Sequence, residues 1–556
     1  MSTPCTTDSL LIFFFCFRHD MSLDIARSHG FQYDEQNEFI FNETLIAIED
    51  KLLAITGKGL IDYGLPPSTR GELRKSHEWI RETSFVVSKL EETLKGVSSL
   101  NPEQKYVYNE FCNALEFGLG GFWFINAPGG TGKTFLINIF LAKVRFAKGI
   151  AVAVASSGIA ATMLAGGGTA HSRFKIPLDL KDDKPTCNLS PNSAMAEVLR
   201  EASLIIWDEC TMSPAKAYEA VDRMLRDIVD GDRKNEIMGG KLVIMTGDFR
   251  QTLPVVPRGT RVDELQASIK ASTLWKEVRQ YQLTTNVRAE QTGDPDAKTW
   301  ADLLLQIGEG RLTQTGIVKV PDEVYVADRN ALMDQIFPDL HLNFERENWL
   351  SKRAILAPKN CLVDEINETL LKKIPGQERE YKSLDLPIKG PDSIRYPTEV
   401  LNSMNFPGIP AHKLILKKGA PIILMRNLNP PMLVNGTRLQ ILNLGNSKLE
   451  AKILVGEYAG QVVYIPKIPL IPKDCGIQFK RVQFPVKLSF SMSINKAQGQ
   501  TLKKVGLLLE EPCFSHGQFY VGCSRVGTDK NLKIVCPNQR TKNVVYKEAL
   551  GELNIS

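Results

Sequence analysis

Short apolar runs that end in small or polar residues recur along the chain and predict buried strands. Stretches whose apolar residues fit the period of a helix follow these runs, the first of them at 135–140. Strands that alternate with helices in this way predict a parallel sheet with helices on both faces. The runs that form this first sheet are 122–126, 150–155, 203–207 and 241–246.

A second α/β unit begins near residue 281, with a strand at 353–358 and another at 505–509. Between them, residues 396–482 are rich in proline and in short β-like runs, which predicts a small β module inserted into the second unit. The predicted organisation is therefore a first lobe at 96–280, a second lobe at 281–395 and 483–556, and a β insertion at 396–482.

Three segments fall outside this alternation. In the helical segment 21–95, Leu45, Ile48, Leu52 and Ile55 mark one apolar stripe, which is most simply an amphipathic helix. Residues 1–20 are predicted to be a disordered or mispredicted start, and the polar, proline-broken stretch 174–200 a small insertion in the first lobe.

The glycine-rich stretch 127–134, between the first predicted strand and its helix, predicts a phosphate-binding loop. Glycines allow backbone N–H groups to converge on an anion, and the following helix adds its positive dipole end. Lys133 would reach the β- and γ-phosphates, and Thr134 would hold Mg²⁺. The motif usually opens with glycine, and Ala127 stands there instead. The predicted nucleotide contacts are Pro128, Gly129, Gly130, Thr131, Gly132, Lys133 and Thr134.

Gln104 lies a short distance before this loop and has two interpretations. Asn101 and Pro102 suit the start of a helix, so Gln104 can close a capping box as the third helical residue. Its amide can equally read the N6 and N7 atoms of adenine. The sequence leaves both open.

Asp208 and Glu209 follow the third buried strand directly. In a phosphate-loop ATPase the first carboxylate supports the metal and the second polarises the attacking water. Gln251 follows the next strand, where a side chain can touch both the γ-phosphate and a bound nucleic acid.

Small and polar residues at other strand ends are candidates for nucleic-acid contact. The glycines at 166–168 leave the backbone free to approach a nucleic-acid strand. The small polar residues at 156–161 could also contact a nucleic-acid backbone, but taken alone they favour an ordinary turn. The predicted nucleic-acid contacts are Gly158, Thr169, His171 and Ser172 in the first lobe, and Ser493, Asn495 and Gln498 in the second.

Composition narrows the class of protein. The 556 residues are 43% hydrophobic and 24% charged, which is typical of a globular protein with several domains, and no apolar run reaches the length of a membrane span. Ten cysteines without a C-x-x-C pair indicate reduced thiols rather than a zinc module. Because the net charge is only +5, nucleic acid would be bound in a local groove.

In this order, the motifs resemble those of the Pif (petite integration frequency) family of DNA helicases. The resemblance covers about residues 97–550, and its departures are Ala127, Ala497 and Gly522-Cys523, none of which removes a charged catalytic group. The motifs are Leu100 to Gln104, the phosphate loop, Asp208-Glu209, Gly247 to Pro254, Thr285 to Arg288, Asn495 to Thr501 and His516 to Val526.

The resemblance implies two RecA-like phosphate-loop lobes with a small β-barrel in the second, and an ATP-dependent helicase that moves 5′ to 3′. It implies that Gln104 reads adenine, that Asp208 supports Mg²⁺, that Glu209 is the base and that Gln251 senses the γ-phosphate. Arg288 and Arg525 would cross from the second lobe to the transition state. The implied partners are single-stranded and tailed duplex DNA, in repair, recombination, telomere maintenance or transposon replication. The implied location is the nucleus, with mitochondria as the alternative.

Other interpretations stay open or fail. Residues 36–67 resemble the segment upstream of the helicase in Helitron replicases, but the seven histidines include no pair one residue apart for the nuclease of those proteins. A guanine-nucleotide switch fails because Gln498 stands where a carboxylate is needed. A catalytically silent nucleic-acid-binding protein and an RNA translocase remain alternatives. The sequence carries no signal for the oligomeric state.

Overall fold

The computed structural model divides into two units, residues 1–80 and 81–556, which are described separately. It describes Ser22 and residues 41–42, 44–46, 48–49, 59–68, 77–177, 179–180, 182–293, 295–388, 396–406, 408–429, 432–472 and 479–551. The predicted start at 1–20 lies outside the described residues.

In the first unit, a small apolar cluster joins Leu45 and Ile48 of the predicted stripe to Leu60 and Leu65. Leu60 opens the short 3₁₀ helix η1 (Leu60–Tyr63). The other two stripe positions, Leu52 and Ile55, lie outside the described residues.

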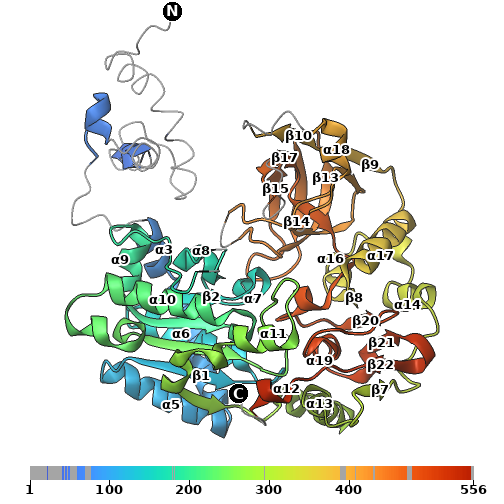
Figure 1. Cartoon of the computed structure of the whole chain (residues 1–556), viewed down its shortest axis with the longest axis horizontal. Helices are drawn as coiled ribbons and strands as arrows, with labels where there is room; N and C mark the ends of the chain where they lie inside the picture. Colours follow the sequence, from blue (N-terminus) through green and yellow to red (C-terminus); the bar gives the residue numbers. More distant parts are fainter. Residues whose placement is uncertain are drawn as a thin grey trace, which may run out of the picture. The chain divides into compact units, whose positions relative to one another are not determined.

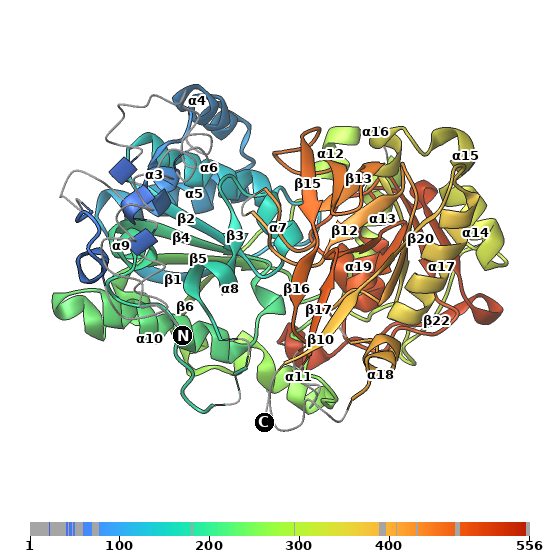
Figure 2. The same ribbon diagram turned by 90° about the horizontal axis from the view of Figure 1, so that it is seen from above.

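The second unit begins its core with a six-stranded sheet in the order β3-β2-β4-β5-β1-β6, in which every pairing is parallel. The sheet and its helices form the left-hand part of Figure 2, and they confirm the predicted α/β fold. Its strands are β1 (Gly121–Asn126), β2 (Ile150–Ala155), β3 (Gly168–Thr169), β4 (Ala202–Asp208), β5 (Leu242–Gly247) and β6 (Val278–Gln282).

Helices cover both faces of this sheet because alternate strand residues point to opposite sides. Trp123 and Ile125 of β1 pack with the helices α5 (Pro102–Glu116) and α6 (Lys133–Phe146). Phe124, the residue between them, contacts the rings of Phe249 and Trp275 instead. Other helices of this lobe are α4 (Val87–Lys95), α7 (Gly158–Thr162), α8 (Ala170–Phe174), α9 (Ala194–Glu201), α10 (Ala215–Ile228) and α11 (Arg261–Ala267).

The second lobe has a four-stranded parallel sheet in the order β19-β8-β20-β21. Ile355 and Ala357 of β8 pack in one apolar cluster and Ala354 and Leu356 in another, so this sheet too is covered on both faces. Its strands are β8 (Arg353–Ala357), β19 (Ser491–Ser493), β20 (Lys504–Leu508) and β21 (Leu532–Val535), and its helices include α13 (Pro295–Gly308), α14 (Arg329–Ile336), α17 (Asn360–Lys373) and α19 (Gln518–Cys523). Helix α12 (Val287–Thr292) follows β6 of the first sheet.

The predicted β insertion consists of antiparallel sheets, drawn in orange in Figure 1. The largest has five strands in the order β15-β14-β13-β12-β18, and its closure into a barrel stays a prediction, as do the domain boundaries. Strands β9 (Arg379–Lys382) and β10 (Leu384–Pro387) pair with β11 (Lys413–Leu416) and β17 (Phe479–Gln483), so pairing extends N-terminal to residue 396. The remaining strands are β12 (Pro421–Leu424), β13 (Arg438–Leu444), β14 (Lys448–Ile453), β15 (Val462–Pro466), β16 (Ile468–Leu470) and β18 (Val486–Leu488).

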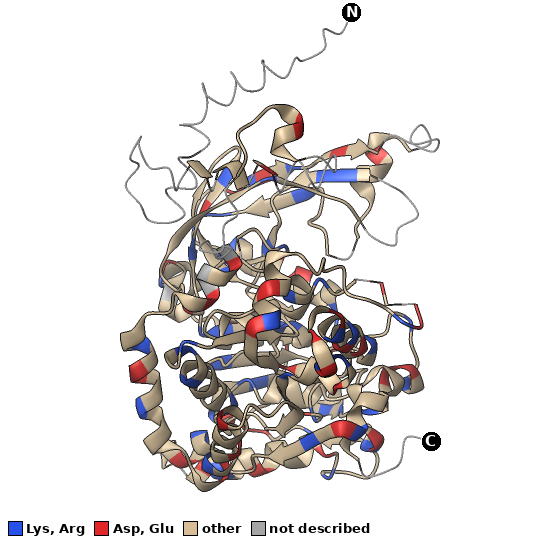
Figure 3. Ribbon diagram, turned by 90° about the vertical axis from the view of Figure 1, so that its left-hand side faces the viewer, with Lys and Arg blue, Asp and Glu red and all other residues tan. Residues whose placement is uncertain are grey.

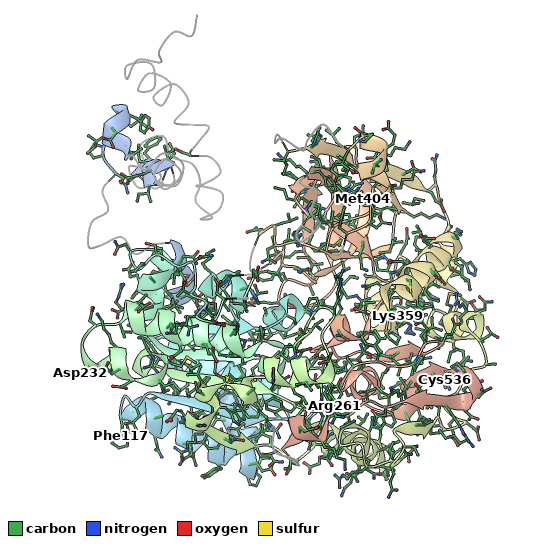
Figure 4. All side chains as sticks on the ribbon, viewed as in Figure 1. Phe117, Asp232, Arg261, Lys359, Met404 and Cys536 are labelled. Carbon is green, nitrogen blue, oxygen red and sulfur yellow. The ribbon has the colours of Figure 1, made fainter. Side chains whose placement is uncertain are left out.

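The C-terminal helix α20 (Lys547–Leu550) links the two lobes. Arg261 of the first lobe, labelled in Figure 4, binds the Glu548 carboxylate with a closest contact of 2.6 Å. On the other side, the backbone N–H of Tyr546 donates to His516 Nδ1 of the second lobe over 2.8 Å. Within the described part of the chain, no helix is both long and apolar enough to cross a membrane.

Candidate active site between the two lobes

The predicted phosphate loop joins the carboxyl end of β1 to the first turn of α6. Gly130 and Gly132 have φ angles of 94° and 78°, which side chains rarely adopt, so the turn needs glycine at these two positions. Ala127 is buried and donates its N–H to the Gly247 carbonyl over 2.9 Å, with no left-handed φ of its own. Alanine therefore fits where glycine is usual.

Lys133 lies between two carboxylates at the end of β4. Its Nζ is 2.7 Å from Asp208 Oδ1 and 2.6 Å from Glu209 Oε1. Burial by itself would lower the pKa of Lys133, but the charges of Asp208 and Glu209 outweigh it and raise the pKa above its usual value. The structure therefore brings these three predicted residues together, with the amine protonated.

Glu209 is held at both carboxylate oxygens. Its Oε1 accepts from Lys133, and its Oε2 accepts from Gln498 Nε2 over 3.1 Å. Burial would raise the pKa of Glu209, but the charge of Lys133 and these hydrogen bonds lower it overall. The residue has a φ of 50°, a strained conformation for a non-glycine residue and one that is found at functional sites.

Asp208 uses only one of its carboxylate oxygens in hydrogen bonds. Its Oδ1 accepts from Thr246 Oγ1 over 2.6 Å and from the N–H of Glu209 over 2.8 Å, besides its contact with Lys133. Its Oδ2 and the half-buried hydroxyl of Thr134 are oxygen donors of the kind that a hard divalent cation prefers.

Gln104 makes both hydrogen bonds of the predicted capping box, and it also contacts the phosphate loop. Its Oε1 accepts from the N–H of Asn101, and its own N–H donates to Asn101 Oδ1, which completes the capping box. Its Nε2 donates to the Thr131 carbonyl of the phosphate loop over 2.8 Å. The side chain is buried, so its amide supports the loop in this structure.

Gln251 is buried, and its Oε1 has no hydrogen-bond partner among the residues that the structure describes. A buried amide oxygen without a partner is costly, and such groups are found where a ligand or water completes the site.

Arg525 and Arg288 flank the site from different places. The Arg525 guanidinium is buried and donates to the carbonyls of Ala497, Gln500 and Val521 over 3.3, 3.1 and 2.8 Å. Burial lowers the pKa of Arg525, and the charge of Glu209 partly restores it.

The prediction that Arg288 crosses from the second lobe differs from the structure. Arg288 follows β6, the edge strand of the first sheet, and its backbone N–H donates to the Gly130 carbonyl over 3.1 Å. Its side chain then reaches Thr501 Oγ1 of the second lobe over 3.1 Å. The sequence analysis placed the start of the second lobe near residue 281 and so missed that Arg288 follows the first sheet. Strand 278–282 was not recognised because it carries three polar residues and lacks an apolar run.

A cavity of 550 Å³ opens beside the phosphate loop. Asn286 at its wall donates to the Gly129 carbonyl over 3.4 Å, and a side chain at Gly130 would collide with it. Three of its lining residues, Pro128, Gly129 and Thr131, are predicted nucleotide contacts, whereas the positions of α13 in the lining carried no signal in the sequence. The lining includes Pro128, Gly129, Thr131, Thr285, Asn286, Ala289, Lys298, Asp302, Leu305 and Tyr520.

The predicted nucleic-acid contacts of the first lobe lie around α7 and the end of β3. The Thr169 hydroxyl donates a hydrogen bond to the Ser172 hydroxyl over 3.0 Å. Burial lowers the pKa of the neighbouring His171. Gly158 faces the turn at Asn435 of the β insertion so closely that an added Cβ would lie 1.7 Å from that carbonyl oxygen.

The predicted nucleic-acid contacts of the second lobe lie at the end of β19 and in the turn just after it. Ser493 and Asn495 are partly exposed, and Asn495 Oδ1 accepts from Gln518 Nε2 over 3.1 Å. Gln498, in contrast, is buried at Glu209. Gly499 lies against Ala160 of α7, so the two predicted sets meet. Figure 3 shows Lys and Arg spread over both lobes and the β insertion.

Comparison with known proteins identifies similar chains. The family model described as PIF1-like helicase matches residues 99–316, and that of the 2B domain of DNA helicase Pif1 matches residues 399–444. The "ATP-dependent DNA helicase PIF1" of Danio rerio is 27% identical over 419 residues, which are 74% of this chain and 58% of that protein. The Pif1 of Bdellovibrio bacteriovorus is 26% identical over 75% of this chain and 85% of its own length.

Solved structures of similar fold include Pif1 helicase from Candida albicans, which is 25% identical with a TM-score of 0.56, over 81% of this chain and 98% of that one. A Bacteroides Pif1 helicase in complex with ADP-AlF3 and ssDNA is 21% identical with a TM-score of 0.60, over 82% and 96% of the two chains. Because this chain spans 58% of the zebrafish relative, the activity and partners of such whole proteins are proposals for it.

Proposed function

Because this chain belongs to the PIF1-like helicase family, we propose that it is an ATP-dependent DNA helicase that moves 5′ to 3′ along single-stranded DNA. The observation that supports this most directly is the cluster of Lys133, Asp208 and Glu209 under a phosphate loop, with Arg288 and Arg525 beside it.

The roles of the cluster follow from its chemistry. Lys133 exchanges its carboxylate partners for the phosphates of ATP, which the loop amides also bind. Glu209 is then released from Lys133 to accept the proton of the attacking water. Thr134 and Asp208 would hold Mg²⁺, which would supply positive charge to the phosphates.

The remaining contacts complete the nucleotide site. The buried amide oxygen of Gln251 has no partner among the described residues and is available to a ligand, and the two arginines would neutralise charge that develops in the transition state. The 550 Å³ cavity is large enough for a nucleoside. Gln104 can read adenine only if its amide leaves Thr131 or the cap, so in the resting state it supports the loop.

Motion of the lobes couples this chemistry to the strand. ATP bound between two lobes that both contact single-stranded DNA would close them, and hydrolysis would let them open. The contact of Gly158 with Asn435 places the β insertion against one of the turns that are predicted to bind the strand. We place this activity in the nucleus, on tailed duplex DNA.

A strand-displacement assay tests the proposal. With ATP and Mg²⁺, the protein should unwind a duplex with a 5′ single-stranded tail and leave 3′-tailed and blunt duplexes nearly intact. Lys133→Ala is the matched control and should unwind none of them. Efficient unwinding from a 3′ tail alone would contradict the polarity, and unwinding of an RNA duplex only would contradict the substrate.

A further inference from the structure

Gln498 occupies a position that strand binding does not explain. It belongs to the turn that follows β19 of the second lobe, yet its side chain is 1% exposed and reaches into the first lobe. There it lies between Thr252 and Glu209, two residues that follow different strands of the first sheet.

The hydrogen bonds fix the orientation of this amide. Thr252 Oγ1 donates to Gln498 Oε1 over 2.5 Å, and Gln498 Nε2 donates to Glu209 Oε2 over 3.1 Å. An ionised carboxylate only accepts, so the NH₂ group must face Glu209 and the carbonyl must face Thr252. The carboxylate therefore sets which end of the amide it meets, and the Thr252 hydroxyl, by donating to the other end, holds the amide in that orientation.

The turn that carries Gln498 is itself fixed by the second lobe. Arg525 donates to the carbonyls of Ala497 and Gln500, the residues on either side of the Gln498-Gly499 pair. A movement of the second lobe away from the first would therefore withdraw Gln498 from Glu209 as a unit.

We infer that Gln498, oriented by Thr252, is a positioning residue that aligns the Glu209 carboxylate only when the two lobes are closed. This inference rests on the proposed function, in which Glu209 is the base of ATP hydrolysis. It assigns to Gln498 a role in timing hydrolysis, in place of the predicted contact with the strand, and it gives Thr252 a role that the sequence did not suggest.

Steady-state ATP hydrolysis with saturating single-stranded DNA tests it. Thr252→Val keeps the shape of the side chain but removes the hydroxyl, and it should lower kcat by roughly tenfold to 10²-fold through misalignment. The KM for ATP and the affinity for a fluorescein-labelled oligothymidine should stay near those of the wild-type protein. Thr252→Ser restores the hydroxyl and should restore kcat, which a general loss of packing would not allow.

Gln498→Ala provides the second variant and should show the same loss of kcat. The double variant should lose little more than either single one, because the two residues act as one unit. Thermal unfolding of each variant separates loss of alignment from loss of fold.

Three results would overturn the inference. Thr252→Val with the wild-type kcat would show that the orientation of the amide does not matter. Gln498→Ala with weaker oligothymidine binding and unchanged kcat would restore the strand contact. If the wild-type protein itself hydrolyses no ATP, the proposed function fails and this inference with it; the first two results leave the proposed function standing.

Discussion

Glu209 is buried beside Lys133 and Gln498, and an amide at this position would keep its volume and one of its two acceptor oxygens. Glu209→Gln should therefore still bind ATP, while hydrolysis falls by roughly 10²- to 10⁴-fold, since an amide cannot accept the proton of water. Binding of a fluorescent ATP analogue and release of phosphate measure the two effects. Lys133→Ala should instead lose binding as well, and turnover near wild-type in Glu209→Gln would show that another group is the base.

Single residues that the sequence singled out lie together in the structure where local patterns carry the chemistry, and their roles stay predictions. The phosphate loop and Asp208-Glu209 could be predicted because glycine spacing and strand ends are local signals. Gln498 could not be placed, because its contact with Glu209 joins residues that are far apart in sequence and depends on how the two lobes pack. The amide of Gln104 serves the helix cap and the loop together, which no pattern of single positions distinguishes.

Glu82, upstream of the region that the helicase family model matches, forms a buried ion pair with the first lobe. Its Oε1 is 2.8 Å from Arg173 Nη2, and its Oε2 is 3.7 Å from Arg145 Nη2. All three side chains are almost fully buried. Burial lowers the pKa of Arg145 to about 10, although the charge of Glu82 opposes this. The two arginines in turn donate to the carbonyls of Ala165 and Gly166, which begin the glycine turn.

Glu82→Gln should therefore destabilise the protein by about 3–5 kcal/mol, because it removes a buried negative charge that lies against two buried guanidinium groups. Urea unfolding measures the change. The exposed Glu91, on α4, supplies the control Glu91→Gln, which should stay within about 0.5 kcal/mol of the wild type. A similar small effect for Glu82→Gln would mean that the pair contributes no net stability.

Whole elements were predicted to different degrees. The buried strands β1, β2, β4 and β5 follow from apolar runs, and the structure confirms them. Strand β6 was missed because it lies at the sheet edge, where polar residues are tolerated. The small strands β9 and β10 pair with partners dozens of residues away, so their sequence alone did not indicate where the β insertion begins. The resemblance to Helitron replicases stays a prediction, since residues 36–40 and 50–58 lie outside the described part.

His516 connects both lobes and makes their association sensitive to acid. Its Nε2 donates to the Phe249 carbonyl of the first lobe over 2.7 Å, while its Nδ1 accepts from Tyr546, so the folded imidazole is neutral. Burial lowers the pKa of His516 from 6.5 to about 4, and the Phe249 carbonyl offsets this only in part. Protonation would place a donor opposite the Tyr546 N–H.

The stability that His516 contributes should therefore be complete above pH 6.5 and be lost as the pH falls from 6.5 toward 4. In that range the unfolded chain binds the proton and the folded chain does not. At about 1.4 kcal/mol per pKa unit, the loss approaches about 3 kcal/mol. Thermal unfolding between pH 7 and 4.5 measures it. His516→Gln should lose this pH dependence, and the exposed His341→Gln should keep it. A profile unchanged in His516→Gln would assign the acid sensitivity to another group.

Helix α4 precedes the first sheet in the chain, but it packs on α6, which follows strand β1. Its packing partner is therefore synthesised later than α4 itself. Its Leu94 contacts the core of the first lobe, and Gly96 just after it lies against Phe135 of α6, so closely that a Cβ would be 2.7 Å from the ring. On a ribosome, α4 leaves the exit tunnel roughly fifty residues before the end of α6, a delay of about 3–10 s at ordinary elongation rates. During that interval α6 is not yet available to the apolar face of α4, and the nascent chain offers this face to chaperones or to other nascent chains until α6 has left the tunnel.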